Sequence, residues 1–172
     1  MNLHNIIYNA EKYELTGEDI KKFIPDCLII AYHNLKNYNS IDEIFNKYNT
    51  LFLLYETKEN YGHWCVLNRI NNNTIEFFDP YGYKLDQELK YSNYNLNDKG
   101  APHLTDLFNN SNYKVYSNIY KFQKEKKDVN TCARHCIVRT KFIKIPIIEY
   151  KNFFGNSNPD YFVSAMTIIN SL

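Results

Sequence analysis

Two cysteines in the segment DVNTCARHCIVR, residues 128–139, carry the side chains best suited to covalent chemistry. We expect a helix to begin near Cys132, where unpaired backbone N–H groups and the positive end of the helix dipole favour a thiolate. Cys136 lies one turn further along and gains little, because this effect fades within the first turn. The pattern therefore favours Cys132 as a nucleophile, provided that a base elsewhere in the chain reaches it.

A histidine and an aspartate upstream are spaced to supply that base. His63 opens a predicted strand in GHWCVLNRI (62–70), and Asp79 ends the next one in TIEFFDPYG (74–82), where Pro80 stops strand pairing. The NNN turn between them predicts a hairpin, which brings both side chains to the same end of the sheet. An imidazole that a carboxylate orients in this way can activate a nearby thiol.

Two further residues complete the predicted constellation. Gln123 lies upstream of Cys132, and its amide together with the Cys132 backbone N–H is suited to hold an oxyanion. The alternative interpretation of Gln123 is a solvated residue at a strand end. Trp64 follows the histidine directly, where we expect an aromatic side chain that belongs to the core and also borders the site.

The order GHW, FFDPYG, Gln and NTCARHC resembles the adenain-like and ubiquitin-like-protein-specific cysteine proteases, most of all viral maturation proteases. The resemblance implies a central mixed β-sheet packed between helices. It also implies a nucleophile at Cys132, a base at His63, an orienting acid at Asp79 and an oxyanion donor at Gln123. Trp64 becomes a substrate-groove candidate, and cleavage is expected at Gly-containing sites.

This chain departs from the family pattern at two positions. Ala133 stands where these proteases usually have glycine, and Gln123 lies nine residues before Cys132, further than is usual. His135 is a rival base, but it sits three positions from the nucleophile and no carboxylate accompanies it in the sequence. Arg134 is expected either to bind a carboxylate or to face solvent.

Zinc binding is the main competing chemistry. The ligand set would be the four residues His63, Cys65, Cys132 and Cys136, although structural zinc cysteines usually come as paired knuckles and HWC inside a strand is a poor second half. We expect Cys27 and Cys65 to be buried, inert thiols. The prediction is a site that uses no metal and no cofactor.

The length of 172 residues predicts one α+β domain that spans residues 1–172. A β-meander is expected over 50–82 and a further strand over 113–123. Two helices are expected to begin after capping residues, one after Thr16 and one after Ser40, which forms a capping box with Glu43. Further helices are expected within 84–92 and 104–110, near Cys132 and from Pro159. The path of residues 83–112 is not predicted, but we expect this segment to help shape the substrate groove.

The net charge of +1 favours neither a nucleic-acid nor a membrane partner. With no signal peptide visible and cysteines expected to be reduced, we expect an intracellular monomer in the host cytoplasm or virus factory, or packaged in the virion. The amino-acid usage, rich in Asn, Ile and Lys, is typical of an A+T-rich genome, as in a virus or parasite.

The expected substrates are virion precursor proteins. One alternative function is the removal of ubiquitin-like modifiers from host proteins, and the other is a non-catalytic zinc or interaction module. The resemblance adds a peptide or DNA activator as a candidate partner.

Overall fold

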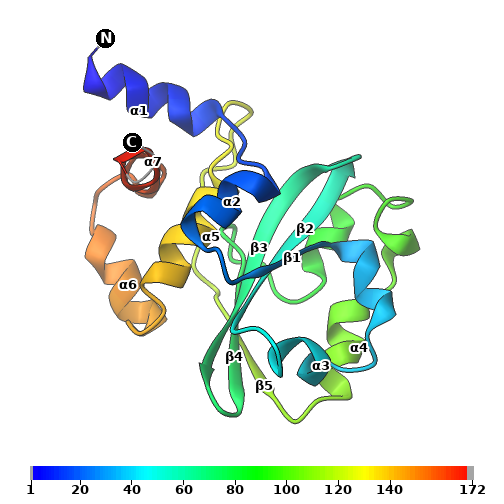
Figure 1. The fold of residues 1–172 in the computed structure, drawn as a ribbon. Coiled ribbons are helices and arrows are strands. Elements are labelled where there is room, and N and C mark those ends of the chain that lie inside the picture. The colour runs from blue at the N-terminus through cyan, green and yellow to red at the C-terminus, as the bar shows by residue number, and fades with distance from the viewer. Residues whose placement is uncertain (1, 170–172) are drawn as a thin grey trace.

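A five-stranded mixed sheet forms the centre of the computed structural model, which describes residues 2–169 (Figure 1). Its three middle strands form an antiparallel meander, as predicted, and the two edge strands run parallel to their neighbours. The strands lie side by side in chain order: β1 (Leu28–Ala31), β2 (Thr50–Lys58), β3 (Tyr61–Asn71), β4 (Thr74–Phe78) and β5 (Lys114–Ser117).

Helices cover both faces of this sheet (Figure 1). On one face lie α2 (Gly17–Phe23), α5 (Cys132–Lys141), α6 (Ile147–Phe154) and α7 (Pro159–Ile169), with α1 (Leu3–Lys12) packed on α7. On the other lie η1 (Tyr32–Asn37), α3 (Ile41–Phe45) and α4 (His103–Asn109), and two short 3-10 turns, η2 (Gln87–Lys90) and η3 (Asp98–Gly100), follow β4. None of the described helices combines the length and apolar character that a membrane span requires.

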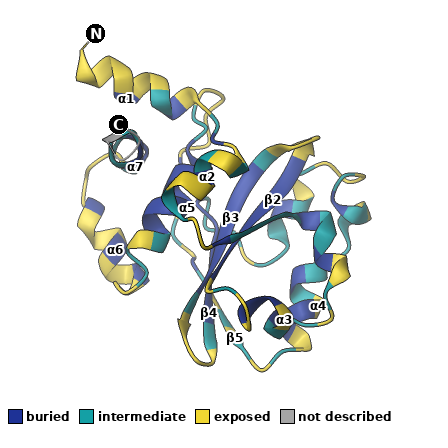
Figure 2. Cartoon of the chain, viewed as in Figure 1, coloured by how far each residue is buried: buried dark blue, intermediate teal, exposed yellow. Residues whose placement is uncertain are grey.

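The alternation of side chains along the strands divides the core in two. Along β3, Trp64 and Val66 point towards α5, whereas Cys65 and Leu67 point towards the η1 and α4 layer. Both clusters are almost fully excluded from solvent, and most residues of β2, β4 and α5 and the middle of β3 are buried (Figure 2). The sheet is therefore buried on both faces, which gives the strand ends a rigid support.

Two of the helix starts predicted from capping residues are confirmed by side-chain hydrogen bonds. Thr16 and Asp19 make the predicted capping box of α2, and the Asn158 side chain accepts a hydrogen bond from the Asp160 N–H at the start of α7. The capping box predicted at Ser40 is wrong, because no side-chain cap bond forms there.

Three other elements differ from the predictions. The strand expected over 113–123 is only β5, because the chain after Ser117 leaves the sheet to bind the turn that follows β4. The helix expected within 84–92 shrinks to the single turn η2. Helix α1 was not anticipated, and it packs mainly on α7, at the far end of the sequence.

A buried ion pair ties α5 to the sheet. Arg139 in α5 binds Glu76 in β4 through two parallel hydrogen bonds, Nε to Oε1 at 2.7 Å and Nη2 to Oε2 at 2.8 Å. The remaining Nη1 donates to the carbonyls of Phe142 and Ile145, so the guanidinium is well satisfied although Arg139 is only 1% exposed. This pair sets how α5 lies across the sheet.

We expect Glu76→Gln to destabilise the fold by about 3 to 5 kcal/mol, because it leaves the Arg139 charge buried without its counter-charge. Urea unfolding followed by circular dichroism would measure the loss. Lys22→Gln, which removes one partner of the exposed Lys22–Asp19 pair, is the control and should leave the unfolding midpoint unchanged. Equal midpoints for the two variants would contradict a stabilising role for the buried pair.

Candidate active site

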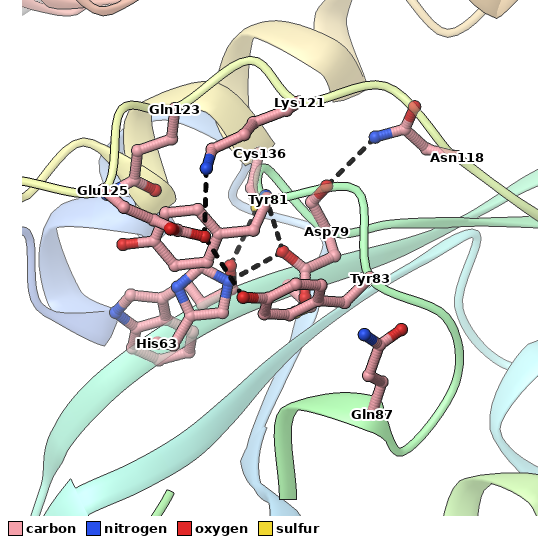
Figure 3. Close-up of polar contacts among 12 residues, drawn as sticks. His63, Asp79, Tyr81, Tyr83, Gln87, Asn118, Lys121, Gln123, Glu125 and Cys136 are labelled. Carbon is pink, nitrogen blue, oxygen red and sulfur yellow. Dashed lines mark hydrogen bonds and ion pairs between the residues drawn. The ribbon is translucent and has the colours of Figure 1, made fainter. Parts of the chain in front are cut away.

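A buried histidine–aspartate pair lies at the end of the β3–β4 hairpin (Figure 3). His63 Nε2 lies 2.9 Å from Asp79 Oδ1, and the two residues are 7% and 0% exposed. The hairpin brings them together as predicted, since β4 stops at Phe78 and leaves Asp79 free to turn towards the start of β3. With Nε2 bound to the carboxylate, Nδ1 is the ring nitrogen left for another partner.

Gly62 makes the position of His63 in the sheet attainable. Strand β3 approaches β2 so closely here that a Cβ on Gly62 would lie 1.9 Å from the Tyr55 carbonyl oxygen. Only glycine fits at this point, and the next residue, His63, pairs with Tyr55 in register. The GHW motif therefore combines a close strand approach with the histidine that follows it.

The DPYG turn fixes the carboxylate. Asp79 Oδ1 also accepts a hydrogen bond from the Tyr81 N–H at 2.7 Å, and Oδ2 accepts one from Cys65 Sγ at 3.4 Å. The Gly82 N–H donates to the Asp79 carbonyl, and Gly82 has φ +76°, which favours glycine. The carboxylate therefore has a partner on each oxygen and a single orientation.

Asn118 ties this turn to the segment that leads towards Cys132, and the sequence reasoning did not identify it. Its Nδ2 donates to the carbonyl of Asp79 at 3.0 Å (Figure 3), and also to the carbonyl of Tyr120 at 2.9 Å. The backbone N–H groups of Phe122 and Gln123 both donate to the Pro80 carbonyl. An asparagine after a short strand carries no sequence signal for this role, because one of its partners, Asp79, lies 39 residues away in the chain.

The surroundings of His63 favour its charged form. Burial alone would lower the pKa of this imidazole, but the charge and hydrogen bond of Asp79, together with Cys132, outweigh it and raise the pKa well above its usual value. The ring of Tyr81 also stacks on the imidazole, with 4.6 Å between centroids and 11° between planes. The site therefore orients the His63 ring and favours its protonated form.

Cys132 is the first residue of α5, as predicted, and its side chain interacts with the imidazole of His63. It is 5% exposed and lines the same cleft as His63. The three residues predicted to act together, Cys132, His63 and Asp79, thus lie at one place in the structure. Ala133, at the position where the resembling proteases have glycine, is 1% exposed and packed in the core.

A second buried histidine–carboxylate pair holds the backbone on both sides of Cys132. His135 Nε2 lies 2.9 Å from Asp160 Oδ1, which also accepts a 2.6 Å hydrogen bond from the Thr131 hydroxyl. The prediction that no carboxylate accompanies His135 is therefore wrong, because α7 brings Asp160 to it from 25 positions along the chain. Burial would raise the pKa of Asp160, but His135 and Thr131 more than offset this and lower it.

Gln123 lines the cleft with Cys132, and it is buried, not solvated. Its Nε2 donates to the Val129 carbonyl at 3.2 Å, and its Oε1 is buried without a hydrogen-bond partner among the described residues. One of the two amide hydrogens is committed to Val129, which leaves the second one for a ligand.

Trp64 does not border the cleft, so this part of the prediction is corrected. Strand alternation points its side chain away from His63 into the core under α5, where it is 4% exposed and donates from Nε1 to the Leu15 carbonyl at 3.2 Å. Cys136 is packed as predicted and donates from Sγ to the Trp64 carbonyl. Arg134, expected on a carboxylate or in solvent, is 4% exposed and donates instead to the Thr167 hydroxyl.

The cleft has a volume of about 460 Å³. Four of its lining residues, Tyr81, Tyr83, Glu88 and Tyr91, come from the segment after β4, which includes the start of the stretch whose path the sequence does not predict. This segment is held in place by Asn97, whose amide bonds both the Glu56 N–H and the Glu56 carbonyl in β2. The cleft is lined by Glu14, Thr57, Lys58, Tyr61, Gly62, His63, Tyr81, Tyr83, Glu88, Tyr91, Gln123, Glu125, Val129, Asn130 and Cys132.

Metal binding at this place would compete with the dyad. Among the described residues, one set of three possible ligand atoms, from His63, Cys65 and Asp79, lies within 4.8 Å. It shares only His63 and Cys65 with the zinc set considered from the sequence. In the structure these donors bond to one another: His63 Nε2 lies 2.9 Å from Asp79 Oδ1, and Cys65 Sγ donates to Asp79 Oδ2 at 3.4 Å. The chemistry of the donors therefore fits a hydrogen-bonded dyad better than a metal centre.

Glu88 is an unexpected ionisable group in the cleft, and it makes stability depend on pH. Burial raises its pKa from 4.5 to about 7, and it is 5% exposed. Because the folded state holds this proton more tightly than the unfolded state, the stability linked to Glu88 is present below pH 4.5 and is lost as the pH rises towards 7.

Relative to Glu88→Gln, we therefore expect the wild type to lose on the order of 3 kcal/mol of unfolding free energy between pH 4.5 and pH 8. Urea titrations at several pH values would measure the difference. Glu59→Gln, an exposed glutamate in the β2–β3 turn, should follow the wild-type curve. A Glu88→Gln curve parallel to that of the wild type would show that Glu88 titrates normally.

Comparison with known proteins finds a relative by sequence and neighbours by structure. No family model matches the chain. The central domain of the uncharacterized protein Lpg1148 from Legionella pneumophila aligns with a TM-score of 0.43 at 14% identity, over 92% of this chain and 97% of that one, and so weak a likeness carries no argument. The uncharacterized protein V9 of Sputnik virophage is 35% identical over 168 residues, which cover 92% of this chain and 96% of V9. At this identity and coverage, the chain belongs to the same family as the virophage protein V9.

Proposed function

We propose that this protein is a cysteine endopeptidase with the fold and mechanism of the adenain-like and ubiquitin-like-protein-specific proteases. One observation carries the proposal: Cys132 begins a helix beside an imidazole that a buried aspartate orients, and the cleft opens onto both reacting residues. Nucleophile, base and orienting acid in hydrogen-bonded order are the arrangement that covalent catalysis of acyl transfer requires.

The geometry suits a thiolate–imidazolium pair. Asp79 binds Nε2 of His63, which leaves Nδ1 to carry the proton that Cys132 gives up. The helix N-terminus and the imidazolium both stabilise the resulting thiolate. Tyr81, stacked on the ring, and the Tyr81 N–H on the aspartate hold this orientation throughout the reaction.

In the reaction that follows, the Cys132 thiolate attacks the scissile carbonyl carbon, and the oxyanion accepts hydrogen bonds from the Cys132 N–H and the free Gln123 amide hydrogen. His63 gives its proton to the leaving amine as the C–N bond breaks, which leaves a thioester on Cys132. Water then loses a proton to His63 and hydrolyses the thioester, which restores the starting state.

Relatedness to a virophage protein supports a viral setting, in which the substrates are virion precursor proteins cleaved at Gly-containing sites. Removal of ubiquitin-like modifiers from host proteins is the alternative for the same chemistry. Incubation of the protein with capsid precursors and, separately, with ubiquitin-like fusions distinguishes the two by which substrate is cut.

Iodoacetamide labelling near pH 6 with mass mapping tests the nucleophile. We expect Cys132 to react at least about tenfold faster than Cys27, Cys65 and Cys136, which are all 0% exposed and whose thiol pKa values burial raises. His63→Ala should slow the Cys132 reaction, whereas His4→Ala in the exposed part of α1 should not. Equal, slow labelling of all four cysteines, or bound zinc in stoichiometric amount with inert thiols, would refute the peptidase.

The role of Asp79 can be followed through the titration of His63. In Asp79→Asn the carboxylate charge that raises the pKa of His63 is lost, so the NMR titration midpoint of this ring should fall by about one to three pH units. His103, whose partner is Asp98, serves as the internal control and should not move. An unchanged His63 midpoint would mean that Asp79 holds the ring without setting its charge.

A further inference from the structure

The cleft wall beside the dyad is built of stacked tyrosines. Tyr81 lies against Tyr83 with 5.7 Å between ring centroids, and Tyr83 stacks on Tyr91 at 5.2 Å with 21° between planes. All three rings line the cleft, and Tyr91 is 60% exposed at its outer end. Aromatic faces carry partial negative charge and attract cations, and Lys58 shows this within the cleft, since its Nζ lies 4.5 Å above the Tyr61 ring.

A buried carboxyl group with one oxygen lacking a hydrogen-bond partner among the described residues belongs to the same wall, and the charge of His63 only partly offsets its burial. Glu88, in η2, is 5% exposed, lines the cleft and has its Oε2 buried with no hydrogen-bond partner among the described residues. Its negative charge is close enough to Tyr81 and Tyr83 to contribute to the raised pKa of both phenol hydroxyls. A carboxyl in this state stays costly to bury until a donor reaches it.

The other acidic groups of the cleft are already engaged. Glu125 binds the Lys121 ammonium and accepts from the Tyr83 hydroxyl (Figure 3), and Glu14 accepts from the Gly62 N–H. Lys58 is the one lysine or arginine among the lining residues, and it lies over Tyr61. Glu88 is thus the acid of the cleft left to pair with something from outside.

We propose that Glu88, with Tyr83 and Tyr91, forms a subsite for a lysine or arginine side chain of the peptide substrate, near the bond to be cut. A basic side chain supplies a hydrogen-bond donor and a further positive charge for the buried carboxyl, and a cation for the faces of Tyr83 and Tyr91. Its aliphatic stem would lie along the tyrosine rings. The proposal rests on the proposed peptidase function and names a side chain that its substrates carry.

Binding of a small probe tests the subsite without any catalysis. N-acetyl-lysine amide is titrated into protein with isotope-labelled tyrosines, followed by NMR, against the uncharged N-acetyl-norleucine amide. We expect saturable binding of the lysine compound with shifts at Tyr83 and Tyr91, at least tenfold weaker binding of the norleucine compound, and a similar loss in Glu88→Gln. Glu59→Gln is the matched control, since it removes the same charge from an exposed turn outside the cleft lining, and it should bind like the wild type.

Cleavage of a mixed peptide library then maps the side chain to one substrate position. In the wild type, lysine and arginine should be enriched at least tenfold at a single position near the cut, and Glu88→Gln should remove the enrichment while still cutting neutral peptides. Equal binding of the two probes, or an unchanged preference in Glu88→Gln, would overturn the subsite. A uniform loss of cutting in Glu88→Gln, with the basic preference kept, would instead assign Glu88 to positioning of His63. Probe binding without cleavage of any peptide would reject the peptidase and leave the cation site standing.

Discussion

The hydrogen bond between His63 and Asp79 depends on where one strand pairing ends. Strand β3 pairs with β4 only as far as Val66 opposite Phe78. Asp79, the residue after β4, therefore leaves the ladder and turns its carboxylate towards His63 at the start of β3. A slip of one residue in this register would turn every side chain of β4 to the opposite face of the sheet and take the carboxylate away from the imidazole. The burial of the sheet on both faces opposes such a slip, because each face needs its own apolar set. The orientation of the histidine is thus a consequence of core packing.

The nucleophile comes from the other layer, so the site also depends on how that layer is held. Helix α5 is fixed at its far end by the Arg139–Glu76 pair and at its near end by Asp160, which binds Thr131 and His135 on either side of Cys132. Asp160 lies in the first turn of α7, and α7 is in turn covered by α1. Helices from both ends of the chain therefore fix the backbone at Cys132, although neither contributes a reacting group. This explains why elements far from the cleft matter to its geometry.

The sequence was informative where a role depends on neighbours along the chain, and it failed where the partner is distant. The β-meander, the Thr16 cap and the placement of Cys132 at a helix start follow from local patterns, and all were confirmed. The pairing of His135 with Asp160 and the role of Asn118 depend on tertiary contacts that no spacing rule contains. Trp64 was misplaced for a different reason: adjacency to His63 was taken as proximity to the groove, whereas side chains in a strand alternate and neighbours face opposite ways.

Two buried glutamates show how the same side chain serves stability at one place and binding at another. Both carboxylate oxygens of Glu76 accept hydrogen bonds from Arg139, and Nη1 of the guanidinium donates to two backbone carbonyls. This pair therefore leaves no group to bind a ligand. Glu88 is nearly as buried but keeps one oxygen without a hydrogen-bond partner, and burial raises its pKa to about 7 because the charge of His63 offsets only part of the cost. An unpaired buried carboxyl lowers the stability of a fold at neutral pH, and replacing it with glutamine would remove that loss. Its place on the wall of the cleft, beside aromatic rings and close to His63, supports the view that the partner it lacks is carried by the substrate.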